Sequence, residues 1–283
     1  MSTIIGNQTA VTLAGVNALV YTPADMDPNK KYALILHIHG QGECGVGVAG
    51  LKNLTNTSLP QRIANGLKPA ASDGTEFIVV SPQGQYSPPP SFVLKPFLAA
   101  LLAAYPQIDT NRMIPTGYSN GGYSCWTCIT DDVKFAAQFA AVVPVSAAPV
   151  EEKANVNGVT ITRVTNISIN VAANKTPVWN ICGVDDGFIA FADAQTAAIN
   201  AVTTGPKAAD SRVPNDKHDT WNFVYDPAKT WAEVGNINFY DWAAKQSLTP
   251  AVVVPPVTTP PVVAAKTIKS IVITYSDGSV VTL

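Results

Sequence analysis

Charged side chains are scarce in this 283-residue chain. Asp, Glu, Lys and Arg make up only 13% of it, against a usual fraction of about 25%. The formal net charge of -2 contains no long run of either sign, which argues against nucleic acid or an anionic membrane as the main partner. No apolar run is long enough to span a bilayer. The surface must therefore rely on Asn, Thr, Ser and Gln, a bias that favours an extracellular or particle-displayed setting over the cytoplasm.

Export signals and cross-linking residues are also sparse. Residues 1–7 lack the basic region and apolar core of a signal peptide, so we expect retention in the cell, another export route, or a leader outside this sequence. Four cysteines are too few for a disulfide scaffold of this length. Cys125 and Cys128 form a C-x-x-C, but its place inside a predicted helix favours buried packing over redox chemistry. No suitably spaced Cys and His set predicts a zinc site.

What the chain does contain is an alternation of buried strands and helices. Almost continuously apolar runs predict five strands covered on both faces: 32–39, 77–81, 113–117, 140–145 and 178–182. Helical spacing predicts four helices: 91–105, 120–130, 188–202 and 238–246. An antiparallel hairpin over 8–13 and 18–21 opens the chain. The sequence thus predicts an α/β protein with a doubly wound, mostly parallel sheet and flanking helices.

Two segments disturb this pattern. Pro115 would remove a ladder donor from strand 113–117, so we expect a bulged or distorted strand end there. Residues 151–176 are rich in Val, Thr and Asn with alternation, which predicts an inserted β-hairpin beside the active site.

Composition divides the chain into three predicted parts. Residues 1–248 are predicted to form one α/β domain, and five prolines predict a semi-rigid linker over 249–265. Residues 266–283 predict a β-hairpin around the turn Ser276-Asp277-Gly278. A lone hairpin is marginal in water, so it needs a surface on its own domain, on a second copy or on another protein. Packing in cis and an attachment role both stay open.

A nucleophile elbow is the most specific motif in the chain. Gly117-Tyr118-Ser119-Asn120-Gly121 matches G-x-S-x-G, the turn that lifts a serine hydroxyl above a parallel sheet. Serine at this turn has a strained backbone, and glycine two residues to either side avoids a clash. The helix that follows points free N–H groups at the site. The motif predicts that Ser119 is a nucleophile.

A serine nucleophile needs a base and an orienting carboxylate. The chain has three histidines, and α/β-hydrolases carry the triad in the order serine, acid, histidine. Only His218 follows Ser119, so it is the candidate base. Asp186 is the favoured acid and Asp185 the alternative, because both follow the buried strand 178–182 at the carboxyl edge of the sheet.

The remaining candidates surround the nucleophile. Backbone N–H groups of Asn120, directly after Ser119, and of Gln41, in the glycine-rich loop 39–45, are the candidate oxyanion donors. Candidate substrate-lining residues are Tyr118, Trp126, Trp221 and Glu43. The three aromatic residues fit a place in the core equally well.

These segments resemble the α/β-hydrolase esterases that include polyhydroxybutyrate depolymerases, feruloyl and acetyl-xylan esterases, and predicted peptidases. The similarity covers most of 16–246. It rests on five motifs: H-G-x-G-E at 39–43, I-D-x-x-R at 108–112, S-x-G-G at 119–122, G-x-x-D at 183–186 and H-x-x-W at 218–221. The resemblance implies the α/β-hydrolase fold and a triad of Ser119, Asp186 and His218. Cys182 departs from the family, which usually has histidine there, and 151–176 is longer than expected.

The sequence therefore predicts a serine esterase that works through an acyl-enzyme without metal or organic cofactor. An acylated carbohydrate or a similar neutral ester, small or polymeric, is the expected substrate. One alternative is a serine peptidase of the same fold. Another is a display or structural module of a virion or surface complex that carries an esterase domain. In that case the hairpin 266–283 would mediate self-association or bind a partner protein.

Overall fold

The computed structural model describes residues 3–156, 158–202, 204–214, 216–248, 272–274 and 280–282. The chain divides into two units, Met1–Leu248 and Thr249–Leu283. In the second unit, β12 (Val272–Thr274) pairs antiparallel with β13 (Val280–Thr282). The predicted linker at 249–265 and the predicted turn Ser276-Asp277-Gly278 lie outside the described residues, so the attachment hypothesis stays a prediction.

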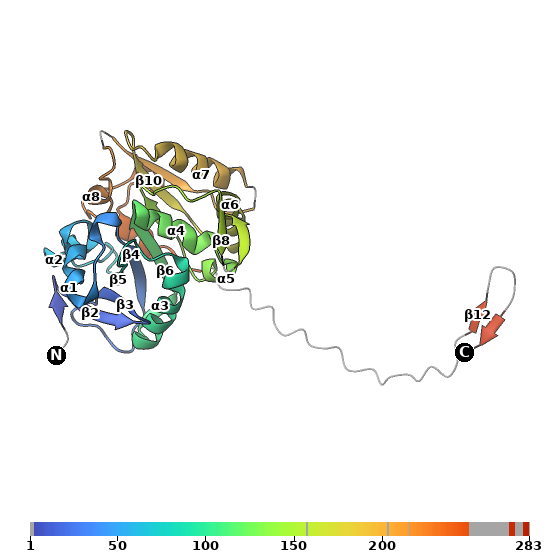
Figure 1. Cartoon of the computed structure of the whole chain (residues 1–283), viewed down its shortest axis with the longest axis horizontal. Helices are drawn as coiled ribbons and strands as arrows, with labels where there is room; N and C mark the ends of the chain where they lie inside the picture. Colours follow the sequence, from blue (N-terminus) through green and yellow to red (C-terminus); the bar gives the residue numbers. More distant parts are fainter. Residues whose placement is uncertain are drawn as a thin grey trace. The chain divides into compact units, whose positions relative to one another are not determined.

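A nine-stranded sheet forms the centre of the first unit (Figure 1), in the order β1-β2-β3-β5-β4-β6-β7-β10-β11. From β5 to β11 all neighbours pair in parallel, whereas β1, β2 and β3 add antiparallel strands at one edge. The strands are β1 (Ile4–Ile5), β2 (Gln8–Leu13), β3 (Val16–Tyr21), β4 (Tyr32–Ile38), β5 (Phe77–Gln83), β6 (Ile108–Tyr118), β7 (Val143–Val145), β10 (Trp179–Gly183) and β11 (Ala209–Val213). The predicted doubly wound, mostly parallel sheet is confirmed.

Helices cover both faces of this sheet (Figure 1). The α-helices are α1 (Gly47–Gly50), α2 (Ser58–Ala64), α3 (Ser91–Ala104), α4 (Asn120–Thr130), α5 (Val133–Ala136), α6 (Arg163–Asn174), α7 (Ile189–Ala201), α8 (Trp221–Val224) and α9 (Phe239–Ala244). Three short 3-10 helices are η1 (Gln41–Glu43), η2 (Leu51–Asn56) and η3 (Ala232–Val234).

The core explains why the strands are almost continuously apolar. Side chains alternate between the two faces of a strand, and in β4 the neighbours Leu34 and Ile35 enter different apolar clusters. The cluster around Leu34 packs against α3, α4, α6 and α7, and the cluster around Ile35 packs against α2, α8 and α9. Both faces of β4 are therefore buried, as expected of a central parallel strand.

The predicted distortion at Pro115 is wrong. Pro115 pairs in register with Leu36 of β4, and the irregularity in β6 lies upstream, between Ile108 and Met113. Backbone groups of alternate residues point to the same neighbouring strand, and Met113 O accepts from Ala140 N on the β7 side. The N–H that Pro115 lacks would therefore face β7, whose ladder with β6 begins one residue later, at Thr116. No ladder bond is lost at this position.

The segment 151–176 forms a hairpin only in its first half. β8 (Lys153–Val156) pairs antiparallel with β9 (Val159–Thr162), but the following residues form α6 rather than a strand. Ile167, Asn170 and Val171 recur at helical spacing and are buried. Burial of this face overrides the strand preference of Val, Thr and Ile. β11 was not predicted from the sequence either.

The C-x-x-C lies in α4, where Cys125 and Cys128 are both fully buried and free. Burial raises the pKa of both thiols. The packing interpretation of these two cysteines is confirmed.

Candidate active site

Ser119 stands on a strained turn between β6 and α4. Its backbone has φ 54° and ψ -122°, a region that L-residues rarely occupy. A Cβ atom added at Gly117 would lie 2.7 Å from both Ile38 O and Gly121 O, and one added at Gly121 would lie 2.2 Å from Ile38 O. Because these are backbone atoms, only glycine fits on either side of the serine. The local sequence thus holds the Ser119 hydroxyl at the carboxyl end of the sheet.

Three side chains from separate loops meet at this turn. His218, in the loop between β11 and α8, places Nε2 3.0 Å from Ser119 Oγ. Its Nδ1 lies 3.0 Å from Oδ2 and 3.2 Å from Oδ1 of Asp186, in the loop after β10. A proton on Nδ1 directed at the carboxylate leaves Nε2 free to accept from the serine hydroxyl. Asp185, the alternative acid, is exposed, and its backbone N–H donates to Asp216 O.

The Asp186 carboxylate is held in its charged form. The residue is only 4% exposed, and burial alone would raise its pKa. Hydrogen bonds from Phe188 N–H, from the Ser146 side chain and from His218 outweigh burial and bring the pKa below its usual value. The same carboxylate acts in the opposite sense on Cys182, whose pKa is raised to about 12 by burial and by the negative charge of Asp186. Cys182 therefore remains a neutral thiol beside an ionised acid.

The two residues that carry the candidate oxyanion donors contact each other through their side chains. Asn120 is the first residue of α4 and Gln41 the first residue of η1, so their backbone N–H groups have no acceptor within their own helices. Asn120 Nδ2 donates to Gln41 Oε1 at 2.9 Å. Gln41 Nε2 donates to Tyr86 O at 2.6 Å. Together these bonds connect the elbow, the loop after β4 and the loop after β5.

The candidate lining residues are placed differently from the prediction. Trp126 is fully buried and packs edge-on against Phe191, so its assignment to the substrate site is wrong. Tyr118 is 2% exposed and stacks on Trp221, with ring centroids 4.3 Å apart. Trp221 presents its ring at 90° to His218 and donates Nε1 to Thr57 Oγ1. Tyr118 and Trp221 therefore pack together next to the elbow, and Trp221 also packs against His218.

Glu43 lies close to Tyr118. A Cβ atom added at Gly40 would lie 2.5 Å from Cε2 of the Tyr118 ring and 3.2 Å from Glu43 Oε2, so the acid and the ring lie close together, and burial and the Glu43 carboxylate both raise the pKa of Tyr118. Glu43 Oε2 is buried and has no hydrogen-bond partner within the part of the chain that the structure describes. Glu43 is therefore a candidate for holding the loop after β4 on Tyr118.

A hollow of about 500 Å³ opens beside Asn120, and nothing in the sequence singled it out. Its walls are Ser87, Pro88, Pro90, Phe92, Ala148 and Pro149, and its polar side is formed by Asn120, Tyr123 and Arg163. The residues come from the loop after β5, from α3, from α4, from the loop after β7 and from α6. Only the fold brings such distant segments together.

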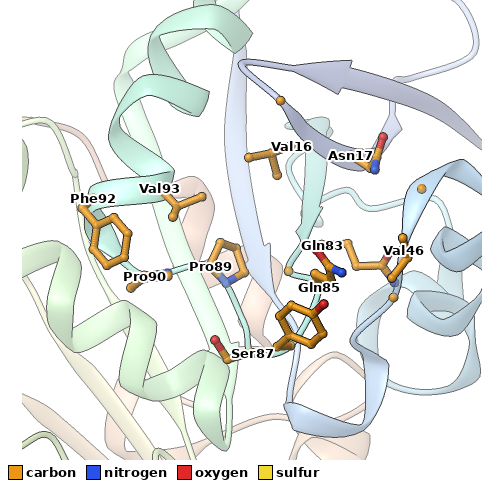
Figure 2. A pocket seen from close by; sticks show the side chains of 15 residues that line it. Val16, Asn17, Val46, Gln83, Gln85, Ser87, Pro89, Pro90, Phe92 and Val93 are labelled. Carbon is orange, nitrogen blue, oxygen red and sulfur yellow. The ribbon is translucent and has the colours of Figure 1, made fainter.

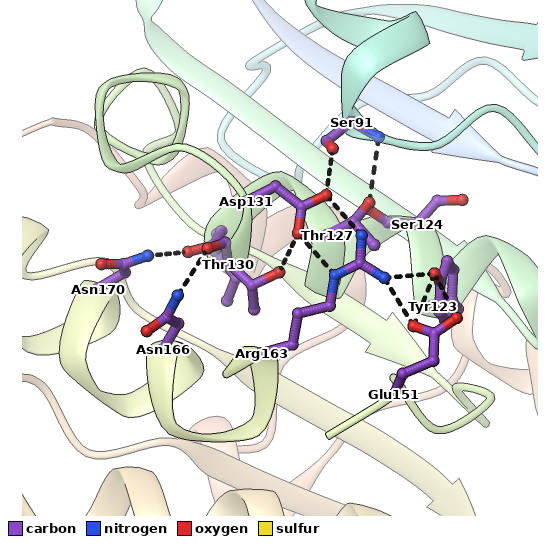
Figure 3. Close-up of polar contacts among 11 residues, drawn as sticks. Ser91, Tyr123, Ser124, Thr127, Thr130, Asp131, Glu151, Arg163, Asn166 and Asn170 are labelled. Carbon is purple, nitrogen blue, oxygen red and sulfur yellow. Dashed lines mark hydrogen bonds and ion pairs between the residues drawn. The ribbon is translucent and has the colours of Figure 1, made fainter. Parts of the chain in front are cut away.

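On the polar side of this hollow, Arg163 forms ion pairs and hydrogen bonds that use most of its donors (Figure 3). Arg163 binds both oxygens of Asp131, with Nε–Oδ1 at 2.8 Å and Nη2–Oδ2 at 2.9 Å. Its Nη1 donates to Glu151 Oε2 and to Tyr123 Oη, both at 2.6 Å. Four of the five guanidinium N–H donors are therefore used. Asp131, one of the earlier aspartates between Ser119 and His218, serves this network rather than the histidine.

Searches for metal and membrane features gave two limited findings. Among the described residues, no group of three or more His, Cys, Asp and Glu could hold a metal ion. No helix in the described ranges is both long and apolar enough to cross a membrane.

No family model matches the chain, and no curated protein matches it. Solved structures do. A thermostable esterase matches with TM-score 0.56 at 22% identity, over 86% of this chain and 64% of that one. A mutant feruloyl esterase module from Clostridium thermocellum, complexed with sinapinate, matches with TM-score 0.52 at 19% identity, over 77% and 84%. Thermogutta terrifontis esterase 2 matches with TM-score 0.53 at 12% identity, over 78% and 88%.

These likenesses establish the α/β-hydrolase fold, and the resemblance stated from the sequence motifs is confirmed at that level. The chain spans less than two thirds of the length of the thermostable esterase.

Proposed function

We propose that the protein is a serine hydrolase that cleaves carboxylic esters through an acyl-enzyme. The observation that carries the proposal is the continuous contact from Ser119 Oγ to His218 Nε2, and from His218 Nδ1 to Asp186 Oδ2, at 3.0 Å each. The first distance lies within the range for proton transfer between a nucleophile and its base, and the second is a hydrogen bond that can orient the base. The strained backbone of Ser119 adds independent support, because such strain concentrates at functional sites.

The proposed reaction has two halves. In the first, His218 Nε2 takes the proton of Ser119 Oγ as the oxygen attacks the ester carbonyl. The backbone N–H groups of Asn120 and Gln41 stabilise the oxyanion of the tetrahedral intermediate. His218 then returns the proton to the departing alcohol, leaving an acyl-serine. In the second half, His218 takes a proton from water as the water oxygen attacks the acyl-serine carbonyl. The bond from Ser119 Oγ to the acyl group then breaks, the carboxylic acid leaves, and His218 returns the proton to Ser119 Oγ.

Asp186 would keep the imidazole in the required tautomer throughout. Its lowered pKa keeps the carboxylate charged at neutral pH, so it can accept from Nδ1–H and stabilise the imidazolium that forms at each proton transfer. No step needs a metal or an organic cofactor.

A neutral substrate, such as an acylated carbohydrate, fits this site best. The Arg163 charge beside the active centre is already matched by Asp131 and Glu151. It therefore offers little to an anionic substrate. Low charge over the whole sequence supports the same conclusion. Peptide cleavage on the same fold is the alternative, and parallel assays on peptide amides and esters separate the two.

The decisive experiment measures hydrolysis of p-nitrophenyl acetate by four proteins. We expect Ser119→Ala to fall to background and Asp186→Asn to lose about a thousandfold or more in kcat. Asp185→Asn is the matched control, one residue away and exposed, and should stay close to wild type. Equal rates for wild type and Ser119→Ala would sink the proposal. Equal losses in both aspartate variants would remove the assignment of Asp186.

The substrate class needs a separate panel. Acetyl-xylan, feruloyl esters and hydroxyalkanoate esters should be compared with peptide amides under identical conditions. A preference for amides over every ester would replace the esterase proposal with the peptidase alternative.

A further inference from the structure

A second hollow lies beyond the active centre, over the opening hairpin. It measures about 370 Å³ and is bounded by the β2–β3 turn, the loop before α1 and the segment from Gln83 to Val93. In Figure 2, Phe92 and Val93 lie on one side of Pro89, and Gln83, Val46 and Asn17 lie on the other. The hollow has the size of a ligand site.

Its lining mixes apolar side chains with polar side chains that carry no charge. Of the described residues that line it, none is Asp, Glu, Lys, Arg or His, and the polar side chains are Asn17, Gln83, Gln85, Tyr86 and Ser87. Amide side chains both donate and accept hydrogen bonds. They suit a ligand rich in hydroxyl groups, whereas an anionic ligand would need a cation.

Two strongly exposed aromatic rings border the same hollow. Tyr86 is 78% exposed and Phe92 is 66% exposed. Aromatic rings pack against the C–H face of a sugar ring while amides bind its hydroxyls. Exposure of this degree is costly for a ring that packs against nothing, and two such rings at one hollow indicate a binding surface.

The lining of the hollow also leaves one buried acceptor unsatisfied. Gln83 is 6% exposed, and its Nε2 donates to Glu43 O at 2.8 Å and Gly50 O at 2.9 Å. Its Oε1 has no donor within the described part of the chain. A buried oxygen of this kind is normally paired, but it is covered by protein atoms, so the exposed rings and the other polar side chains of the lining offer the accessible contacts.

This hollow adjoins the one beside Asn120. Both are lined by Ser87, Pro90 and Phe92, so the two hollows lie on either side of one shared rim. The rim is also tied to the oxyanion loop, because Gln41 Nε2 donates to Tyr86 O. A chain whose ester reaches Ser119 can therefore extend from Asn120 across Phe92 to Tyr86.

We infer that the two hollows form one groove that binds consecutive sugar rings of an acylated polysaccharide, with Phe92 and Tyr86 as stacking platforms. The inference rests on the proposed function, since it takes the ester at Ser119 as the point of cleavage. It adds a binding site remote from that ester, specific for neutral polysaccharide chains.

Binding is tested without catalysis, in a Ser119→Ala background. Affinity electrophoresis on acetylated xylan and acetylated glucomannan measures the dissociation constant for each polymer. Adding Tyr86→Ala or Phe92→Ala should weaken binding about five- to tenfold. Phe223→Ala is the matched control, because Phe223 is an exposed aromatic residue, 38% accessible, that lines a different hollow. Melting temperatures establish that the variants are folded.

Two outcomes would overturn the groove. Failure of the Ser119→Ala protein to bind either polymer is one. Equal affinity of the platform variants and the Phe223→Ala control is the other. If the wild-type protein hydrolyses no ester while platform variants still lose polymer binding, the proposed function fails and the groove survives.

A second measurement uses active enzyme. The ratio of kcat/KM on acetylated xylan to kcat/KM on p-nitrophenyl acetate should fall about fivefold or more in Phe92→Ala and Tyr86→Ala. The same ratio should stay constant in Phe223→Ala. A parallel fall on both substrates in the platform variants would indicate general damage to the site and would contradict a role in holding the chain.

Discussion

Asn120 donates its side-chain Nδ2 to Oε1 of Gln41 at 2.9 Å. This bond connects the residue after the nucleophile to the loop after β4, and we expect it to help hold in place the two backbone N–H groups proposed to bind the oxyanion. Gln41 is fixed from its other end by the bond from Nε2 to Tyr86 O. Donors that are held before the reaction stabilise developing charge better than donors that must reorganise.

Gln41→Ala should therefore lower kcat about tenfold. The substitution keeps the backbone N–H of residue 41 and removes only the side-chain contacts to Asn120 and Tyr86. Because the substitution affects only how well the backbone N–H of residue 41 is placed for the transition state, KM should change little. Gln61→Ala on α2, where the amide donates to Asn56 O, serves as the control. A change confined to KM would argue that Gln41 contacts substrate instead.

Gly121→Ala should abolish activity. A Cβ at this position would lie 2.2 Å from Ile38 O and 2.5 Å from His39 O, and Ile38 is the last residue of β4, where it pairs with Gly117 of β6. The substitution must displace the elbow, at a cost of about 1–3 kcal/mol or more in folding free energy. Gly187→Ala, at an exposed position with no atom within 4 Å of the new Cβ, provides the control. Activity assays and urea unfolding of both variants check the prediction, and an active Gly121→Ala protein would contradict it.

The residues that meet at Ser119 could be predicted from the sequence, because the signals are local in the chain or leave few candidate residues. The glycines around Ser119 report a strained turn, and His218 was the single histidine downstream of it. The sequence favoured Asp186 as the acid and left its neighbour Asp185 as the alternative, and the contact of Asp186 with His218 supports the favoured choice. The groove could not be predicted, because its walls come from segments as far apart as Gly15 and Arg163.

Errors in the sequence analysis have related causes. Residues 163–174 carry strand-forming side chains, but burial of one helical face decides their conformation. Trp126 follows the elbow closely in sequence, yet a residue inside a helix points where the helix face directs it, which here is the core.

Two buried histidines should make the fold sensitive to mild acid. Burial lowers the pKa of His37 to about 3 and that of His39 to about 4, from the ordinary 6.5. His37 Nε2 contacts Ser58 Oγ at 2.9 Å, and His39 Nε2 accepts from Gly84 N–H at 3.0 Å. Between the ordinary pKa and the lowered pKa of each histidine, the imidazole is neutral in the folded state and protonated in the unfolded chain. The unfolded state therefore binds more protons in this pH range. The contribution of the two neutral histidines to the free energy of unfolding is fully present above pH 6.5 and is lost as the pH falls toward 4.

The loss should approach about 1.4 kcal/mol per pH unit for each histidine. Urea unfolding at intervals from pH 7.5 to 4.5 measures this slope. His37→Gln should lower the slope of unfolding free energy against pH by the contribution of one histidine, whatever the effect of the substitution on stability at pH 7.5. A slope identical in wild type and His37→Gln would show that this histidine does not resist protonation.

Arg163 and Asp131 form the most buried ion pair at the site, with side chains 8% and 3% exposed. Asp131→Ala would leave the guanidinium with Glu151 as its remaining acidic partner, and Glu151 is 58% exposed. Removing one partner of a buried pair typically costs about 3–5 kcal/mol, because the other charge stays desolvated. We expect a loss of that order in the free energy of unfolding, together with a raised KM, since Arg163 lines the hollow beside Asn120.

The exposed pair between Lys95 and Asp132 provides the comparison, one residue along the chain from Asp131. Lys95 is 54% exposed, and water screens such a pair, so Lys95→Ala should cost less than about 1 kcal/mol. A double variant, Asp131→Leu with Arg163→Met, should recover part of the stability that Asp131→Ala loses, because it removes the uncompensated charge as well. Urea unfolding of all three proteins tests the argument. If Asp131→Ala costs no more than Lys95→Ala, water must reach the Arg163 network, and the hollow beside Asn120 would then be open to charged substrates.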